Sequence, residues 1–228
     1  MKSADFYLNG AILLIDKPIG VTSFDVVRRI RGIIKKKYQL KGIKVGHAGT
    51  LDPLASGLLV ICTGKATKNI DALINDSKVY TGQGKLGYTT PSYDRETLEI
   101  ATNRPLPTDI TELQTAASTF EGEILQTPPL YSAIKIDGLR AYELARSGQQ
   151  KELKARPVQI FKFEISNFSP PFFDFMVHCS KGTYIRSLIH DFGQRLDCGA
   201  YLTELRRIQS GEFRIEDSIK LESLEEVL

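Results

Sequence analysis

The chain has 228 residues, 42% of them hydrophobic and 25% charged, with a formal net charge of +3, which is the composition of a globular protein that buries a core. Its longest apolar runs are a handful of residues long, far short of the roughly 20 that a helix needs to cross a bilayer. A membrane span is therefore excluded. Asp5, Asn9 and Gly10 stand where a signal peptide would need its apolar stretch, so we expect a cytoplasmic protein.

Cysteine and histidine are both sparse, with three of each. The cysteines are far apart and form no Cys-x-x-Cys motif, which argues against a disulfide framework and against a zinc site. The histidines are too scattered to form a metal-binding pair. We therefore expect reduced thiols, largely in the core, and no metal catalysis. These residues are Cys62, Cys179, Cys198, His47, His178 and His190.

The small net charge hides an asymmetry along the chain. Residues 1–80 carry 13 basic and six acidic side chains, whereas residues 81–228 carry 17 basic and 21 acidic ones. Between Arg28 and Lys44 there are eight lysines and arginines and no acid. Such a concentration of positive charge predicts a polyanionic partner.

The first predicted elements are a strand and a helix. The segment from Ala11 to Ile15 has the apolar character of a buried strand and ends at an Asp-Lys-Pro turn. Thr22 or Ser23 then caps a helix that runs to about Lys36. At about 100° per residue, the apolar side chains of this helix share one face and the basic side chains occupy the other. We therefore expect a core face and a basic face.

The periodicity of apolar residues predicts further elements along the rest of the chain. The predicted strands are 58–63, 79–86, 158–168 and 172–179, and the predicted helices are 66–74, 108–120, 140–146 and 183–196. Strands and helices mix without strict alternation, which favours an α+β fold with a mixed, largely antiparallel sheet flanked by helices. No repeat or Gly/Ser linker interrupts the chain, so we expect a single domain over residues 1–228.

The most unusual segment lies between the basic helix and the apolar strand at 58–63. Residues 44–59 contain three glycines, one histidine and one Asp-Pro pair. One interpretation is a turn in which Asp52 caps a helical turn that begins at Pro53. The other is a rigid loop that holds one carboxylate where glycines let RNA or substrate approach closely.

Residues 46–59 resemble the GHxGTLDPxAxGLL signature of the TruB family, the bacterial tRNA pseudouridine-55 synthases. Further motifs of this family follow in the same order, and the resemblance extends over essentially the whole chain. These motifs are Lys17-Pro18-x-Gly20-x-Thr22-Ser23, Lys78-x-Tyr80, Pro128-Pro129-x-Tyr131-Ser132-Ala133-x-Lys135, Arg156-Pro157-Val158, residues 179–188, Leu205-Arg206-Arg207 and Ser210-Gly211. Chance does not produce so long an agreement in this order.

The resemblance implies a pseudouridine synthase fold and an enzyme that converts uridine 55 in the T-loop of tRNA to pseudouridine. This isomerisation breaks the N1–C1′ bond, rotates the base and rejoins it through C5 without redox change, so no cofactor is expected. The resemblance assigns Asp52 as the nucleophile. Attack on C1′, attack on C6 and abstraction of the 2′ proton all stay open as routes.

The same resemblance implies roles for five other residues. Arg186 would pair with the nucleophilic carboxylate, because a guanidinium fork orients a carboxylate while keeping it charged. Tyr80 would stack on the target base and is a candidate acceptor of the C5 proton. His47 would lie near the flipped nucleotide, whose extrusion from the stack costs a few kcal/mol. Lys17 and Leu205 would shape the pocket.

The basic face of the predicted helix is the candidate for phosphate contacts. A run of charge is usually only a solvated face, but the concentration of positive charge favours an RNA role here. We expect the T-arm stem-loop of tRNA as the partner, and a monomer that needs no protein partner. The helix residues assigned to RNA are Arg28, Arg29, Lys35 and Lys36.

Two features depart from the family pattern. In the loop that the family writes as LGxxTxTxDxxG, Ser92 and Thr97 stand in place of Thr and Gly. Many members also carry a C-terminal PUA domain that binds RNA, whereas this sequence ends shortly after Ser210-Gly211. We therefore expect no PUA domain and an RNA affinity that comes from elsewhere.

Three other interpretations are weaker. A guide-RNA-dependent relative, as found in archaea and eukaryotes, is disfavoured by the bacterial style of the Asp52 loop. An RNA-folding helper whose catalysis is dispensable is a second possibility. A basic amphipathic helix can also bind a membrane surface, but the aliphatic face of this helix predicts burial in a core.

Overall fold

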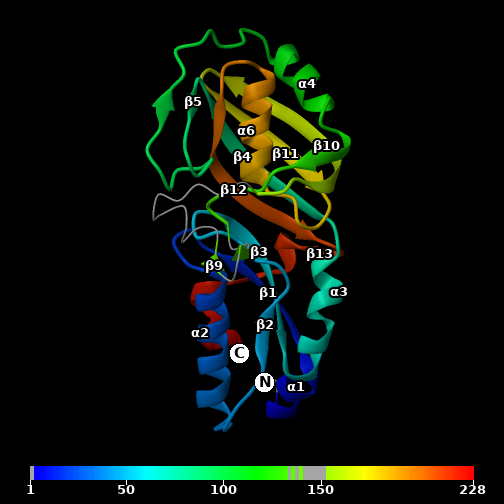
Figure 1. Ribbon diagram of the computed structural model, residues 1–228. Coiled ribbons are helices and arrows are strands. Elements are labelled where there is room, and N and C mark those ends of the chain that lie inside the picture. The colour runs from blue at the N-terminus through cyan, green and yellow to red at the C-terminus, as the bar shows by residue number, and fades with distance from the viewer. Residues whose placement is uncertain (1–2, 133–134, 137–138, 141–152) are drawn as a thin grey trace. The chain divides into compact units, whose positions relative to one another are not determined.

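The computed structural model describes residues 3–132, 135–136, 139–140 and 153–228, and Figure 1 gives the element labels. The chain forms two compact units. Unit 1 comprises Met1–Tyr80 and Leu205–Leu228, and unit 2 comprises Thr81–Glu204. Strands β4 (Lys78–Leu86) and β12 (Ala200–Ser210) each contribute residues to both units. The organisation as a single domain stays a prediction.

Unit 1 is built on a mixed sheet in the order β14-β1-β3-β12, with β2 paired to β3 and β13 to β12. Strands β1 and β3 are antiparallel, and Ile15 lies opposite Leu59. Strand β12 runs parallel to β3 and places Arg207 opposite Gly57. The strands are β1 (Ile12–Lys17), β2 (Val45–His47), β3 (Ser56–Thr63), β13 (Phe213–Arg214) and β14 (Ile219–Lys220). The helices are α1 (Ala4–Gly10), α2 (Ser23–Lys37), η1 (Gly64–Asn69), α3 (Ile70–Ile74), η2 (Ile215–Asp217), η3 (Leu221–Ser223) and α7 (Leu224–Val227).

Strand β3 is buried on both faces, which explains its uninterrupted apolar sequence. Leu59 and Ile61 join a core cluster that contains the apolar face of α2. Leu58 and Val60 join a second cluster, against which side chains of α3 pack. Helices α2 and α3 accordingly lie on opposite sides of these strands (Figure 1).

The N-terminus of α2 is fixed by a capping box. Thr22 is the N-cap, its hydroxyl accepts from the backbone N–H of Asp25, and the Asp25 carboxylate accepts from the backbone N–H of Thr22. The predicted core face is confirmed, because Val26 and Ile30 are fully buried. The helix ends at Lys37, one residue beyond the predicted end.

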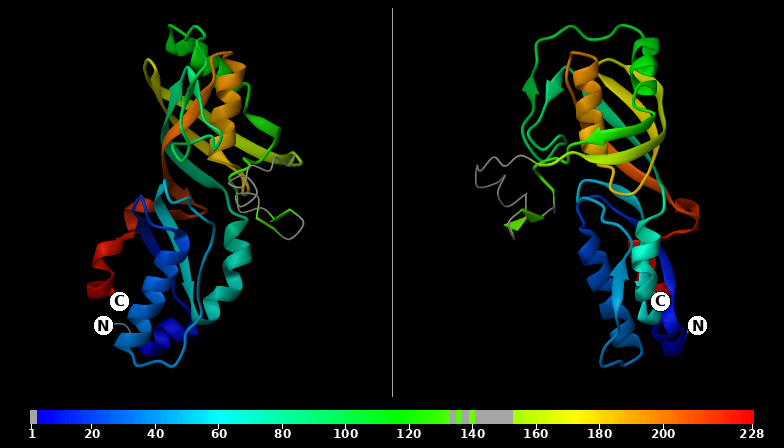
Figure 2. Two further views of the ribbon diagram at one scale, coloured as in Figure 1. Left: turned by 60° about the vertical axis from the view of Figure 1, so that its left-hand side comes forward. Right: turned by 45° about the vertical axis from the view of Figure 1, so that its right-hand side comes forward.

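Unit 2 contains the strand order β12-β4-β11-β10-β7. Helix α6 lies across one face of this sheet, and α4 packs against β10 (Figures 1 and 2). Rings of Phe163, Phe173 and Phe192 meet in the core with centroid separations of 5.2 and 5.3 Å, a favourable range for edge contacts between aromatic rings. The strands are β5 (Tyr88–Thr89), β6 (Ile100–Ala101), β7 (Gly122–Gln126), β8 (Lys135–Ile136), β9 (Leu139–Arg140), β10 (Arg156–Ser169) and β11 (Phe172–Cys179), and the helices are α4 (Ile110–Ser118) and α6 (Ile185–Arg195).

Within the described ranges the sheet is mixed and mostly antiparallel, as the sequence predicts. The predicted helix at 66–74 is instead a 3-10 helix followed by the short α3. Helix α1 is absent from the prediction, because its seven residues are too few to show a periodicity. The predicted helix at 140–146 falls largely outside the described residues. No helix in the described part of the chain is both long and apolar enough to cross a membrane.

Candidate active site

Asp52 lies in the loop that joins β2 to β3 in unit 1. The two strands are antiparallel, with His47 opposite Ile61, and the chain leaves β2 with the N–H of Ala48 donating to the carbonyl of Val60 at 2.9 Å. Within the loop the N–H of Ala55 donates to the carbonyl of Asp52 at 3.0 Å. Asp52 itself is half-buried. The loop is therefore a closed turn that leaves part of Asp52 accessible.

Residues on both sides of Asp52 are tied to the segment that begins α2. The hydroxyl of Ser23 accepts from the N–H of Leu51 at 2.9 Å and donates to the carbonyl of Leu51 at 3.1 Å. The N–H of Gly20 donates to the carbonyl of Pro53 at 2.8 Å. These three hydrogen bonds fix the backbone immediately before and after Asp52.

Arg207 supports the same loop from the core. Its side chain is almost fully buried, its Nε donates to the carbonyl of Leu58 at 2.7 Å, and its Nη2 donates to the carbonyl of Gly49 at 3.2 Å. Gly57 lets β12 approach this closely, because a Cβ there would lie 2.3 Å from the carbonyl oxygen of Arg207. The positive φ of Gly57, +102°, also favours glycine.

Lys17 is a fully buried cation at the end of β1. Its Nζ donates to the carbonyl of Val21 at 2.7 Å and to that of Pro18 at 3.0 Å. Burial lowers the pKa of Lys17 to about 8, the positive charge of Arg207 acts in the same direction, and the negative charge of Asp52 opposes both. Lys17 is thus mostly protonated at pH 7. Its burial fits the shaping of the pocket better than a direct contact with RNA.

His47 ends β2 and is half-buried. Burial lowers the pKa of His47 below its usual value, and the nearby charge of Arg207 lowers it further, against the opposing effect of the Gly49 backbone. His47 is therefore mainly neutral at pH 7. A neutral imidazole suits contact with a nucleobase better than it suits the binding of a phosphate.

Tyr80 and Leu205 are half-buried residues of unit 1, on β4 and β12.

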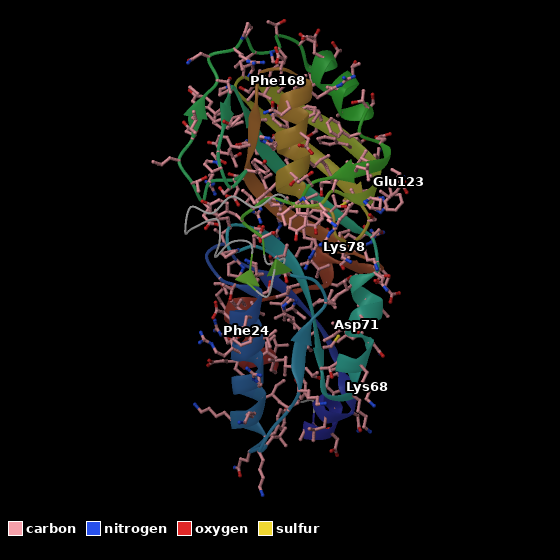
Figure 3. The ribbon with its side chains drawn as sticks, viewed as in Figure 1. Phe24, Lys68, Asp71, Lys78, Glu123 and Phe168 are labelled. Carbon is pink, nitrogen blue, oxygen red and sulfur yellow. The ribbon has the colours of Figure 1, made fainter. Side chains whose placement is uncertain are left out.

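Lys78 anchors the start of β4, two residues before Tyr80. Its buried Nζ donates at 2.7 Å to the carbonyls of Ile74 and Asp76 (Figure 3). These contacts satisfy a carbonyl at the C-terminus of α3 with a positive charge, which is a favourable arrangement there.

Arg186 belongs to unit 2 and is the second residue of α6. Arg186 is 5% exposed. Its Nη1 donates to the carbonyl of Ser92 at 3.2 Å, its Nη2 donates to the carbonyl of Tyr131 at 3.0 Å, and its Nε lies 3.5 Å from Oδ2 of Asp94. The guanidinium is thus held in a defined orientation within unit 2.

The basic face of α2 is exposed as the sequence predicts. Arg28, Arg29, Lys35 and Lys36 are all exposed. Arg28 forms an ion pair with Asp25 at 2.9 Å, a spacing that stabilises helices only weakly. Phe24 is also exposed near the start of this helix (Figure 3).

The structure places most predicted site residues in unit 1 and Arg186 in unit 2. The pairing of Arg186 with Asp52 therefore stays a prediction. Sequence reasoning gave no role to Arg207 and read Ser23 only as a helix cap. Both belong to motifs of the resemblance, which was the one available signal, because a hydrogen bond to a distant carbonyl leaves no local pattern.

Two family descriptions match the sequence. Residues 35–185 match the TruB family pseudouridylate synthase (N terminal domain), and residues 186–228 match the tRNA pseudouridylate synthase B C-terminal domain. The chain is 49% identical over 226 residues to tRNA pseudouridine synthase B of Flavobacterium johnsoniae, which covers 97% of each protein. It is 48% identical over 217 residues to tRNA pseudouridine synthase B of Clostridium novyi, which covers 95% of this chain and 72% of that protein.

Solved structures are similar to the whole fold. One chain of the Cbf5-Nop10-Gar1 complex superposes with a TM-score of 0.74 and 32% sequence identity, covering 99% of this chain and 56% of that one. A chain of the H/ACA RNP bound to a substrate RNA containing 2′-deoxyuridine gives a TM-score of 0.71 and 29% identity. The present chain spans about half the length of these solved chains: 56% and 55%.

Proposed function

The chain belongs to the TruB family of pseudouridylate synthases and isomerises uridine in tRNA, and from this premise we propose that its target is uridine 55 of the T-loop and that Asp52 is its nucleophile. The observation that carries the assignment is the way the Asp52 loop of unit 1 is held. Leu51, before Asp52, is hydrogen-bonded to the Ser23 hydroxyl, and the carbonyl of Pro53, after it, accepts from the N–H of Gly20. A reacting carboxylate has to be held in place, because small misplacements lower rates steeply.

Asp52 acts as an ionised carboxylate in every route that the chemistry allows. The buried ammonium of Lys17 stabilises that charge from within unit 1. Arg207 keeps the loop in place through Gly49 and Leu58. The reaction replaces the N1–C1′ bond of uridine with a C5–C1′ bond, and a proton leaves C5 while N1 gains one. No electrons are gained or lost, so no redox cofactor is needed.

Arg186, Tyr80 and His47 complete the proposed site. Arg186 orients the Asp52 carboxylate with a guanidinium that unit 2 holds rigidly. Tyr80 stacks on the target base, and neutral His47 contacts the nucleotides displaced when the base flips out. Leu205 contributes an apolar wall to the pocket.

The partner is the T-arm of tRNA, bound through phosphate contacts on the basic face of α2. Exposed lysines and arginines supply such affinity without sequence specificity. The enzyme works in the cytoplasm, as a monomer and without a protein partner. Light scattering of the protein without tRNA tests the monomer, with a molar mass near 25.5 kDa expected.

The central experiment incubates an unmodified tRNA transcript with the wild type and with Asp52→Asn, then maps pseudouridine by carbodiimide primer extension. We expect modification at position 55 alone by the wild type, and none by Asp52→Asn. Binding of tRNA by the variant stays within about tenfold, because phosphate contacts supply most of the affinity.

Asp71→Asn is the matched control, because Asp71 is an exposed carboxylate of the same unit (Figure 3). It keeps wild-type turnover. Modification at another uridine by the wild type would reassign the substrate, and substantial turnover by Asp52→Asn would remove the nucleophile assignment. If Asp52→Asn were folded but could not bind tRNA, the separation of catalysis from binding would be wrong.

A further inference from the structure

The guanidinium of Arg186 depends on one loop of unit 2 for two of its contacts. This loop, residues 90–97, supplies the carbonyl of Ser92 to Nη1 and the carboxylate of Asp94 to Nε. Ser92 is fully buried and Asp94 is 6% exposed. The position of Arg186 therefore depends on what holds these two residues.

The Asp94 carboxylate organises the loop around itself. Its Oδ1 accepts from the hydroxyl of Ser92 at 2.6 Å and from the N–H of Glu96 at 2.9 Å. Its backbone carbonyl accepts from the hydroxyl of Thr90 at 2.8 Å. Hydrogen bonds to a charged acceptor are shorter and stronger than those between neutral groups.

Thr97 closes the loop on Ser92. Its Oγ1 accepts from the N–H of Ser92 at 3.1 Å and lies 2.9 Å from the Ser92 hydroxyl oxygen. An ionised carboxylate can only accept, so the single hydroxyl proton of Ser92 points to Asp94. The hydroxyl of Thr97 is then the donor in its contact with Ser92.

These directions give a chain of donors that runs from Thr97 to Ser92 to Asp94 and ends beside Arg186. Hydrogen bonds in such a chain polarise one another. The two positions at which the loop departs from the family pattern, Ser92 and Thr97, are the two whose side chains bond to each other. Glycine at position 97 could make neither contact, so both contacts depend on the Thr97 side chain.

We propose that Thr97 is a positioning residue for Arg186. Its hydroxyl holds the backbone N–H of Ser92 and, through the Ser92 hydroxyl, the Asp94 carboxylate. The carbonyl of the same Ser92 and the carboxylate of Asp94 set the orientation of the guanidinium. The inference rests on the proposed role of Arg186 in orienting Asp52. In this proposal Thr97 acts on Arg186 only through Ser92 and Asp94.

The kinetic test compares Thr97→Val, which keeps the shape but removes the hydroxyl, with Thr97→Ser, which keeps the hydroxyl. Thr97→Val leaves the buried N–H of Ser92 without its acceptor, so we expect kcat to fall about tenfold or more with KM within about twofold. Thr97→Ser stays within about twofold of the wild type. The control is Thr111→Val, at an exposed threonine of the same unit, which leaves both constants unchanged.

A spectroscopic test follows Arg186 directly and needs no tRNA. In 15N-labelled protein, the Nε–H signal of Arg186 is identified by its loss in Arg186→Lys. We expect slow exchange with water in the wild type and in Thr97→Ser, and at least tenfold faster exchange in Thr97→Val. If Thr97→Val does not fold, Ser92→Ala replaces it, because it breaks the same chain one step further along.

The outcomes separate this inference from the proposed function. Unchanged kcat and unchanged Nε–H exchange in Thr97→Val would overturn the positioning role, as would a failure of Thr97→Ser to restore them. Full activity of Arg186→Lys would instead remove the proposed role of Arg186, while the exchange measurement would still decide whether Thr97 holds it.

Discussion

At the scale of single residues, unit 1 buries two cations beneath the loop that carries Asp52. Lys17 and Arg207 both donate hydrogen bonds to backbone carbonyls. These hydrogen bonds lower the free-energy cost of burying both the cations and the carbonyls. Burial lowers the pKa of Lys17 to about 8.

The lowered pKa of Lys17 makes its contribution to stability depend on pH. Between about 8, its pKa in the folded protein, and 10.5, its ordinary value, the unfolded chain binds a proton that the folded chain has lost, so stability rises with pH across this window. Relative to Lys17→Met, the wild type should gain up to about 3 kcal/mol in free energy of unfolding between pH 7 and 11.

Urea unfolding of both proteins across this range measures the effect. Lys65→Met serves as the control, because Lys65 is an exposed lysine of the same unit, and its difference from the wild type should not vary with pH. A difference between wild type and Lys17→Met that is flat from pH 7 to 11 would contradict the lowered pKa.

At the scale of elements, the first turn of α2 has two separate tasks. Thr22 caps the helix through its box with Asp25, whereas the next residue, Ser23, bonds both polar groups of Leu51. Adjacent hydroxyls thus serve the helix and the Asp52 loop. Substitutions at the two positions should have different consequences.

Thr22→Ala should lower the free energy of unfolding by about 1 kcal/mol, the usual cost of losing an N-cap, and leave kcat within about twofold. Ser23→Ala leaves the N–H and carbonyl of Leu51 without their partner in a buried place, so kcat should fall about tenfold or more. Chemical unfolding and steady-state kinetics on tRNA measure the pair. Equal effects of both substitutions on kcat would refute the division of tasks.

The basic face of α2 should determine how tRNA binding depends on salt. Replacing Arg28, Arg29, Lys35 and Lys36 together with glutamine should weaken binding to all RNAs alike and flatten the dependence of affinity on salt, by up to about 0.9 in log–log slope per lost phosphate contact. Filter binding from low to high salt measures this slope.

Four other exposed basic residues of unit 1 provide the matched control, replaced together in the same way. An equal change of slope in both variants would mean that only total charge matters, and no change in either would place the RNA elsewhere. The control residues are Lys65, Lys68, Arg214 and Lys220.

At the scale of the whole molecule, the candidate phosphate contacts occupy a short stretch. Helix α2 has 15 residues, which corresponds to about 22 Å at 1.5 Å per residue. That length is comparable to one arm of a tRNA and much smaller than the whole molecule. Recognition should therefore be confined to the T-arm.

A T-arm stem-loop of roughly 17 nucleotides should accordingly be modified with kcat/KM within about tenfold of intact tRNA, a difference of no more than about 1.4 kcal/mol in transition-state binding. Parallel kinetics on the two substrates measure it, with a stem-loop carrying cytidine at the target position as the blank. A loss of a hundredfold or more would require contacts well outside the T-arm.

The sequence by itself determined the features that rest on local pattern. The two faces of α2, strands β10 and β11 and helix α6 all follow from the periodicity of apolar residues, which neighbouring residues decide. For the cap of α2 the sequence left Thr22 and Ser23 open, and the structure has Thr22 as the N-cap. The residues of the Asp52 loop left a capped turn and a substrate loop open, and the resemblance of residues 46–59 to the TruB signature favoured the second. The family followed from the order of such segments.

Only the tertiary structure decided which distant groups hold those segments. Ser23 bonds Leu51, Arg207 reaches Gly49, and Thr97 secures the loop that receives Arg186. The packing of strands and loops decides which group each of these side chains contacts. Every residue has a backbone carbonyl that can accept a hydrogen bond, so the residue type of the partner gives no signal in the sequence. The sequence therefore predicts the reacting group, whereas the groups that hold it in place emerge only when the chain is folded.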